Sequence, residues 1–558
     1  MNTESIKTEL NKVCEHCQKN FLISEEELNL YKKVEIEFPV LCFLCRTKLL
    51  FAFWTFGKFR KGVSDLSGDS LITVLPTKAH YPIYSLHEWH SDKWDPLSYG
   101  QDYDPTRSFF EQLKELQRKV PRPHQVGSKN TGCDWCDDVW NSKNCYLSRS
   151  MLNCEDLFYS YRNINIKNSI DAIICFSSEK IYDCAECHNS YKLFYSTHSR
   201  DCIDSYFLYD CRNCQNCFMS WNLRNKQYCI ENIQYTKKEY EEKFKNYNLD
   251  SYDSVQKLKK RFEEIIKKEV VHRPNFNYKV YDSMGDYLED TKNCKNCFTF
   301  SKSEDCYNCV RGMSQKSNID VVGSFNVELS GNSLCCQPSG YALKYSTHSP
   351  SRYSEYIDNC IECEYCLGSI GLKKKKYCIL NKQYSKEEYE NLKNKIIGDM
   401  KLRGEYGKFF PYEMAVDAFN FSNGMFYFPE TTKEEILKLG GYWEDVDESH
   451  IEGKLTSELP DSINDVEDNI TTIALICPNT GWRFNVSINE LSFYRENNIP
   501  LPRKHFDTRI RDRLKYLTIL KSFPYKCFYC EKDINAYYPP EWGYQKIACE
   551  ECYKQNIA

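Results

Sequence analysis

The stretch Cys202–Cys229, CIDSYFLYDCRNCQNCFMSWNLRNKQYC, decides the fold of the middle of the chain. Cys202, Cys211, Ser220 and Cys229 lie nine residues apart, so a small side chain returns at one position of a short repeat. A helix would instead repeat its buried positions about every 3.6 residues. Short repeats of this kind are typical of a parallel β-solenoid, whose coils stack on one another. We predict such a solenoid, with the cysteines packed inside it as small apolar groups.

The same nine-residue spacing extends upstream of this stretch. Cys136, Cys145 and Cys154 are nine residues apart, and after a longer step Cys175, Cys184 and Leu193 continue the spacing to Cys202. Tyr recurs seven residues after one of these positions at Tyr161, Tyr182, Tyr191 and Tyr209. Two nine-residue halves would make a flattened coil of about 18 residues.

A second copy of the repeat follows the first. Cys211, Cys214, Cys217 and Cys229 reappear as Cys360, Cys363, Cys366 and Cys378, at a constant offset of 149 residues. YSTHS at 195–199 likewise recurs at 345–349. Each copy ends in a polar segment that we expect to be a helical cap, and the amphipathic stretch 253–271 predicts a helix between the copies.

Four cysteines at each end of the chain have the spacing of a metal site. They are Cys14, Cys17, Cys42 and Cys45 near the start, and Cys527, Cys530, Cys549 and Cys552 near the end. Two CxxC pairs complete the tetrahedral thiolate set of structural zinc and leave no position open for a substrate. The sequence therefore predicts a zinc ribbon at each end and two structural zinc ions.

A third ribbon has lost most of its ligands. The segment beginning CEHCQKNF aligns without gaps with the one beginning CPNTGWRF. The alignment places Cys14 on Cys477, Glu27 on Glu490, Tyr31 on Tyr494 and Arg46 on Arg509, and the other three ligand positions hold Thr480, His505 and Thr508. We expect this degenerate ribbon to bind no metal and to act as a contact surface.

Some solenoid cysteines also form CxxC pairs, so additional zinc sites are an alternative to inward packing. The candidate ligands are Cys133, Cys136, Cys184, Cys187, Cys211, Cys214, Cys294, Cys297, Cys306, Cys309, Cys360 and Cys363. His198 and His348 occupy the same place in both copies and are candidate fourth ligands. The competing interpretation is a buried histidine beside a tyrosine.

Basic residues gather at 503–515, RKHFDTRIRDRLK. The segment contains only two Asp, against the six basic residues Arg503, Lys504, Arg509, Arg511, Arg513 and Lys515. A positive stripe beside a ribbon predicts contact with a nucleic acid or a ribonucleoprotein, and a solvated helix face is the alternative.

Composition limits the class of protein. Lys and Arg total 74 against 79 Asp and Glu, a net charge of −5, which disfavours a polyanion binder over the whole chain. We see no secretory signal and no apolar run of membrane-spanning length, so we expect a cytoplasmic protein without a membrane partner and with reduced thiols. No phosphate-binding loop, dinucleotide fold or nucleophile elbow appears, which favours a protein that is not an enzyme without excluding one.

These observations predict a mainly β chain with helical connectors, in which zinc ribbons at both ends flank two tandem cysteine-lined parallel β-solenoid units. The expected parts are an N-terminal ribbon (1–50), an aromatic-rich linker domain (51–130), solenoid unit 1 (131–245), a helical connector (246–285), solenoid unit 2 (286–400), a small domain (401–443), an acidic linker (444–470), the degenerate ribbon with its basic helix (471–520) and a C-terminal ribbon (521–558).

Several segments carry a family resemblance. They are WHSDKWDPLSYGQDYD (89–104), FFEQLKELQRKVPRP (109–123), NKQYCI (225–230), ELSFYRENNIPLPRKH (490–505) and YYPPEWGYQKIACEECY (537–553). In these the chain resembles a family of uncharacterised zinc-ribbon/cysteine-repeat proteins of candidate-phyla (patescibacterial) bacteria and giant viruses. The resemblance spans nearly the whole chain and implies no activity, and no CoA-transferase motif supports the label that some relatives carry.

The function expected from these features is that of a zinc-binding scaffold that is not an enzyme. Nucleic acid or a ribonucleoprotein is the favoured partner, through the ribbons and the basic segment. One alternative is a structural component of a virion or particle, in which Tyr-rich faces associate with other copies or with a protein partner. The other is an enzyme of unknown class.

Overall fold

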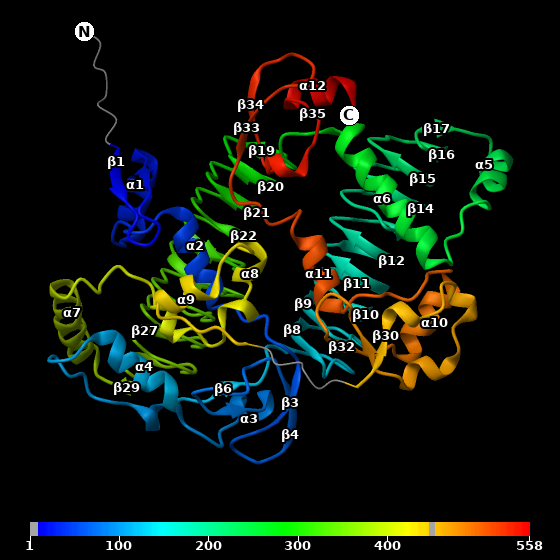
Figure 1. Cartoon of the computed structure of the whole chain (residues 1–558). Helices are drawn as coiled ribbons and strands as arrows, with labels where there is room; N and C mark the ends of the chain where they lie inside the picture. The colour runs from blue at the N-terminus through cyan, green and yellow to red at the C-terminus, as the bar shows by residue number, and fades with distance from the viewer. Residues whose placement is uncertain (1–8, 446–451, 558) are drawn as a thin grey trace, which may run out of the picture. The chain divides into compact units, whose positions relative to one another are not determined.

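The computed structural model describes residues 9–445 and 452–557. The chain forms two compact units, each built from two separate segments: unit 1 from Met1–Gln125 and Asn275–Glu444, and unit 2 from Val126–Pro274 and Asp445–Ala558. Each unit contains one solenoid of parallel strands together with ribbon modules (Figure 1). The predicted fold class, mainly β with two tandem parallel solenoids and four-cysteine modules near both ends, is confirmed.

The strands of unit 2 begin with its solenoid and end with two ribbons. They are β7 (Gly127–Ser128), β8 (Cys136–Trp140), β9 (Ser148–Leu152), β10 (Glu155–Phe158), β11 (Tyr161–Ile173), β12 (Phe176–Ala185), β13 (Tyr191–Phe194), β14 (Ile203–Tyr209), β15 (Gln215–Trp221), β16 (Gln227–Ile230), β17 (Ile233–Gln234), β18 (Val271–His272), β30 (Lys454–Leu455), β31 (Leu475–Ile476), β32 (Arg483–Phe484), β33 (Phe523–Lys526), β34 (Asp533–Ala536) and β35 (Lys546–Ile547).

The strands of unit 1 begin with short ribbon hairpins and continue into its solenoid. They are β1 (Leu10–Val13), β2 (Asn20–Ile23), β3 (Arg60–Val63), β4 (Ser70–Thr73), β5 (Ile83–Tyr84), β6 (Arg122–Pro123), β19 (Tyr278–Tyr281), β20 (Gly285–Lys292), β21 (Cys297–Glu304), β22 (Val310–Met313), β23 (Ile319–Val322), β24 (Val327–Glu328), β25 (Gly331–Leu334), β26 (Gly340–Tyr341), β27 (Glu364–Leu367), β28 (Lys376–Ile379) and β29 (Lys382–Gln383).

Most solenoid coils have 12 residues, and unit 1 also has coils of 11 and 13, so the expected coil of 18 residues is wrong. In unit 2 the parallel neighbours are in register at this step, with Cys217 beside Cys229, and unit 1 repeats the same step. Side chains point inward at every third residue, as at the buried Cys211, Cys214 and Cys217. Nine residues are three such steps, so the sequence spacing identified the inward positions but not the coil length.

In the 12-residue coils the chain turns a corner after each inward residue. The second residue after an inward position there has a left-handed backbone, with φ of 51° at Asn213, 50° at Asn216 and 50° at Met219. This conformation is unfavourable for most residues with a side chain, and Asn and Asp tolerate it best. A 12-residue coil therefore has four sides of three residues, and its corners explain the frequent Asn and Asp of the repeat.

Inward serines satisfy backbone groups inside the solenoid. The Ser148 hydroxyl donates to the carbonyl of Tyr146 at 2.9 Å. It also accepts from the amide of Ser160, one coil further on, at 3.0 Å. Because a buried amide without a partner costs about 1–3 kcal/mol, each inward serine links two coils and removes that penalty.

Inward cysteines form longer versions of the same contacts. The Cys184 thiol donates to the carbonyl of Tyr182 at 3.4 Å and lies 3.1 Å from that of Leu193. Cysteine is a small apolar residue with a weak S–H donor, so it fills the narrow interior and still contacts its carbonyls. The expected inward packing of the solenoid cysteines is what the structure shows.

The helices are α1 (Glu25–Val34), α2 (Phe43–Ala52), α3 (Leu86–His90), α4 (Phe109–Lys119), α5 (Lys237–Phe244), α6 (Tyr252–Lys268), α7 (Lys386–Leu402), α8 (Gly424–Tyr427), α9 (Lys433–Lys438), α10 (Ile488–Glu496), α11 (Phe506–Leu514) and α12 (Glu550–Asn556). The predicted connector helix at 253–271 is α6, and the polar caps are α5 and α7. Part of the expected acidic linker, residues 446–451, lies outside the described residues.

In each unit a ribbon packs on a solenoid that is distant in sequence. In unit 1 the helices α1 and α2 of the N-terminal ribbon contact β23, and in unit 2 the helix α11 of the degenerate ribbon contacts β11 (Figure 1). The chain order therefore pairs the N-terminal ribbon with the second solenoid and the degenerate ribbon with the first.

The two ribbons dock through equivalent buried ion pairs. Arg46 lies 2.8 Å from the carboxylate of Asp320. Arg509, its counterpart in the ribbon alignment, lies 2.6 Å from Asp171. Asp171 and Asp320 are 149 residues apart, the offset that relates the solenoid copies. Tyr31 adds a 2.5 Å hydrogen bond to Asp320. The same arginine–aspartate contact between a ribbon and a solenoid therefore occurs once in each copy of the repeat.

Replacing Ser148 by Ala should lower the free energy of unfolding by about 1–3 kcal/mol, because the Ser160 amide loses its acceptor in the core. Urea denaturation followed by circular dichroism measures the change. The matched control is Ser177→Ala at an exposed solenoid position, where the change should stay within about 0.5 kcal/mol. Equal effects of the two substitutions would contradict the role given to inward serines.

Replacing Arg46 by Ala should destabilise unit 1 by about 3–5 kcal/mol, because Asp320 is left charged and buried without its partner. The double variant Arg46→Ala/Asp320→Ala should recover part of the loss, which a double-mutant cycle in urea denaturation quantifies. Lys48→Ala is the control, since its ion pair with Glu435 is partly exposed and contributes about 1 kcal/mol or less. Strict additivity of the two single changes would show that the pair is not coupled.

Candidate metal centres and a candidate binding pocket

The four cysteines of the N-terminal ribbon converge from two turns. Cys14 follows β1 and Cys17 lies in the turn before β2, while Cys42 is the residue that caps α2 and Cys45 lies in its first turn. Their sulfur atoms all lie within 4.8 Å of one another, with Cys17 and Cys42 3.7 Å apart. Four thiols from two CxxC turns at this spacing could hold one metal ion.

The C-terminal ribbon repeats this geometry. Cys527 and Cys530 lie between β33 and β34, Cys549 caps α12, and Cys552 lies in that helix. These four sulfur atoms also lie within 4.8 Å of one another, with Cys530 and Cys549 3.9 Å apart. The structure therefore brings together both predicted sets of four cysteines.

The solenoid cysteines form no comparable cluster. Within residues 9–445 and 452–557, the two terminal tetrads are the only groups in which three or more potential ligand atoms lie this close. The cysteines considered as further ligands line the solenoid interiors instead. Of the two candidate histidines, His198 is buried with its ring 5.3 Å from that of Tyr209, and the His348 ring bonds to Thr347 at 2.7 Å.

The degenerate ribbon keeps the backbone of the site with only one of its four cysteines. Cys477 is buried and its amide donates to the carbonyl of Trp482 at 2.9 Å, as the equivalent Cys14 amide does in its own turn. His505 caps α11, the place that Cys42 has at α2. Its ring packs edge-on against Trp482 at 5.2 Å. Aromatic packing thus supports this turn.

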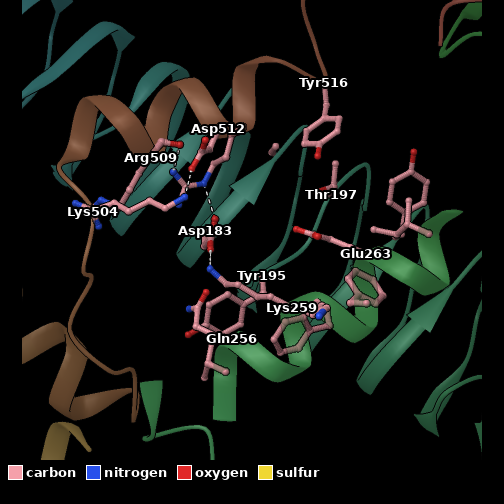
Figure 2. A pocket seen from close by; sticks show the side chains of 18 of the residues that line it. Asp183, Tyr195, Thr197, Gln256, Lys259, Glu263, Lys504, Arg509, Asp512 and Tyr516 are labelled. Carbon is pink, nitrogen blue, oxygen red and sulfur yellow. Dashed lines mark hydrogen bonds and ion pairs between the residues drawn. The ribbon is translucent and has the colours of Figure 1, made fainter. Parts of the chain in front are cut away.

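A cavity of 610 Å³ lies within unit 2. One wall is the solenoid face around Tyr195 and Thr197, and a second is α6. The other walls are α11 with the preceding segment 500–504, and residues 538–544 of the C-terminal ribbon. Figure 2 shows side chains from the solenoid, α6 and α11 converging on this space. No sequence pattern marks this cavity, because its walls come from four segments that are separated along the chain.

An ion network lies at the inner side of the cavity. Asp183 accepts from Arg513 of α11 at 2.5 Å and from Lys259 of α6. Figure 2 shows Lys259 reaching this carboxylate from its helix. Burial raises the pKa of Asp183, but the charges of Arg513 and Lys259 outweigh it and hold the pKa below its usual value. This carboxylate is therefore charged at neutral pH and fixes the positions of α6 and α11.

The lining of the cavity includes aromatic rings and charged side chains of both signs. The Arg503 guanidinium lies 4.4 Å above the ring of Tyr252, and the rings of Tyr516 and Trp542 lie 5.1 Å apart. The cationic side chains of the lining are Lys259, Lys260, Lys267, Arg503, Lys504, Arg509 and Arg513, and the acidic ones are Asp183, Glu263, Asp512 and Glu541. Cations therefore outnumber carboxylates.

The basic segment is divided between the interior and the surface. Arg509 is only 7% exposed and pairs with Asp171, and Arg513 pairs with Asp183. Arg511 is half-buried. These arginines do not form the exposed stripe that the sequence suggested, because solenoid carboxylates bind Arg509 and Arg513. Lys515 is exposed, and Arg503 and Lys504 line the cavity.

No protein-family model matches the chain, and no curated protein matches it significantly. Across the described ranges, no helix combines the length and the apolar composition needed to cross a bilayer.

Purified protein should contain about two metal ions per chain by elemental analysis, because among residues 9–445 and 452–557 only two groups of cysteines have the geometry of a metal site. Cys14→Ala/Cys17→Ala should remove one of them, and Cys527→Ala/Cys530→Ala the other. The control Cys214→Ala, inside the solenoid of unit 2, should leave the metal content unchanged. Four or more ions per chain would mean that the solenoid thiols bind metal.

Proposed function

We propose that this protein is a binding scaffold rather than an enzyme, that its two tetrads hold structural zinc, and that the unit-2 cavity accepts a single-stranded segment of nucleic acid. The zinc assignment is supported by the donor set, since four thiolates in a closed site suit zinc better than oxygen-preferring metals. Such a site supplies folding energy to short ribbons and leaves no position for a reacting group.

The composition of the cavity wall is the observation that carries the nucleic-acid proposal. Single strands bind through bases that stack on aromatic side chains and through phosphates that lie along Lys and Arg. Tyr252, Tyr516 and Trp542 contribute rings to the lining. Lys260 and Lys267 contribute cations, whereas Lys504 already pairs with Asp512 at 2.6 Å. The buried arginines keep a structural role in this proposal.

The solenoids and ribbons supply the rigid frame. In unit 2 the cavity lies between α6 and α11, which are both tied to the solenoid through Asp183. A wall fixed in this way presents its rings and cations without first having to be ordered, which lowers the entropic cost of binding.

Fluorescence anisotropy with a labelled single-stranded oligonucleotide tests the proposal. Lys260→Ala/Lys267→Ala should weaken binding about tenfold at low salt and reduce the slope of log affinity against log salt by about 1.4, since each phosphate contact on a single strand contributes about 0.7. The matched control is Lys237→Ala/Lys238→Ala on α5, which removes the same charge from an exposed helix outside the cavity.

Tyr516→Ala should weaken binding at all salt concentrations, because base stacking contributes about 1–3 kcal/mol per base and is not screened. An affinity that does not change with salt, or equal losses in the Lys260/Lys267 and Lys237/Lys238 variants, would contradict the proposed site.

A further inference from the structure

The hairpin of β3 and β4 has the backbone hydrogen bonds of a ribbon turn. In the terminal ribbons, the amide of the first cysteine donates to the carbonyl five residues on, at 3.0 Å for Cys14 and 2.9 Å for Cys527. The amide four residues on donates back to that cysteine's carbonyl, at 3.0 Å in both ribbons. Ser64 takes part in the same two bonds, at 2.9 and 2.8 Å. Ser64 therefore stands where the first cysteine stands.

The helix α3 begins as the second half of a ribbon does. Ser85 caps α3, as Cys42 caps α2 and Cys549 caps α12. In all three modules, the backbone amide of the residue that follows the first ligand position donates to a carbonyl two residues before the helix cap. In this module the Asp65 amide donates to the Ile83 carbonyl at 2.8 Å. The four ligand positions of this module are thus Ser64, Ser67, Ser85 and Glu88, with the two-residue spacers of a CxxC ribbon.

A carboxylate lies at the centre of the module. The hydroxyl of Ser64 donates to Glu88 Oε2 at 2.5 Å, the hydroxyl of Ser85 at 2.7 Å and its amide at 2.9 Å. Glu88 is 4% exposed. Burial raises its pKa, but hydrogen bonds from Ser64, Ser67 and Ser85 outweigh it and lower the pKa to about 2. Donors from Ser64 and Ser85 thus converge on one carboxylate oxygen, at the place where the terminal ribbons bring four thiols together.

The module also docks as the C-terminal ribbon does. The residue after the fourth ligand position is Trp89 here and Tyr553 there, and both are buried. Lys373 lies 4.6 Å above the Trp89 ring in unit 1, and Arg224 bonds to the Tyr553 hydroxyl at 2.7 Å in unit 2. Lys373 and Arg224 are 149 residues apart, the offset of the solenoid copies.

We propose that residues 60–90 are a fourth ribbon, in which the Glu88 carboxylate and three serines replace a metal ion and its thiolates. Each unit then contains one solenoid, one tetrad ribbon and one ribbon without metal. The segment expected to be an aromatic-rich linker contains this module, and Ser64-x2-Ser67 followed by Ser85-x2-Glu88 was the signal that could have revealed it. This inference does not depend on the proposed binding of nucleic acid.

Restoring the thiolates tests the inference on the full chain. Ser64→Cys/Ser67→Cys/Ser85→Cys/Glu88→Cys should raise the metal content by one ion per chain. With Co²⁺ as the probe, the absorption of tetrahedral, thiolate-bound cobalt should increase in proportion to the one additional ion. The control Ser64→Cys/Ser67→Cys, which keeps Ser85 and Glu88, should add no ion. A folded fourfold variant without an additional ion would overturn the proposal.

Hydrogen exchange of the unaltered chain gives a second readout if the fourfold variant does not fold. With a chelator present, amides of the 14–19 turn should lose protection while those of the 64–69 turn keep it. Glu88→Ala should abolish protection of the 64–69 turn with or without chelator, and Glu88→Gln should do so only in part, because an amide still accepts hydrogen bonds. Loss of protection at 64–69 on chelation alone, or no effect of Glu88→Ala, would count against a carboxylate-centred ribbon.

Discussion

The backbone amides inside the solenoid constrain the rest of the structure. A coil with sides of three residues turns so often that neighbouring strands cannot satisfy every inward amide and carbonyl. A short polar side chain from the adjacent coil completes the bonds, as Ser148 does for Ser160. This requirement explains why serine and cysteine recur at inward positions. Because most of the 31 cysteines fill such positions, only two clusters with the geometry of a metal site form among the described residues.

The solenoids in turn provide fixed docking points for the ribbons. Asp171 and Asp320 are buried on equivalent coils, and each binds an arginine from a ribbon on the far side of the sequence. A buried ion pair contributes little net stability over an apolar contact, but an unpaired buried carboxylate is costly. The pairs therefore act mainly on specificity, because a ribbon packed elsewhere would leave an aspartate buried without its arginine.

The ribbons show that one backbone can be held together by different centres. Four thiols converge in two of them, and in the third the ring of His505 packs against Trp482, Phe484 and Phe506. The hairpin with Ser64 and Glu88 uses a carboxylate in the same turn. What these modules share is the turn and the capped helix, which explains why loss of a ligand does not change where a ribbon docks.

The sequence by itself determined the tetrads, the duplication and the inward cysteine positions, since each depends on spacing along the chain that short turns and coils preserve. It did not determine the coil length, because a nine-residue spacing fits any coil built from three-residue sides. Only the tertiary structure decided which ribbon packs on which solenoid, and with it the burial of Arg509 and Arg513 and the cavity walls around Tyr252. The physical reason is that an arginine's role depends on the carboxylate it meets, and Asp171 and Asp183 lie more than 300 residues away in the sequence.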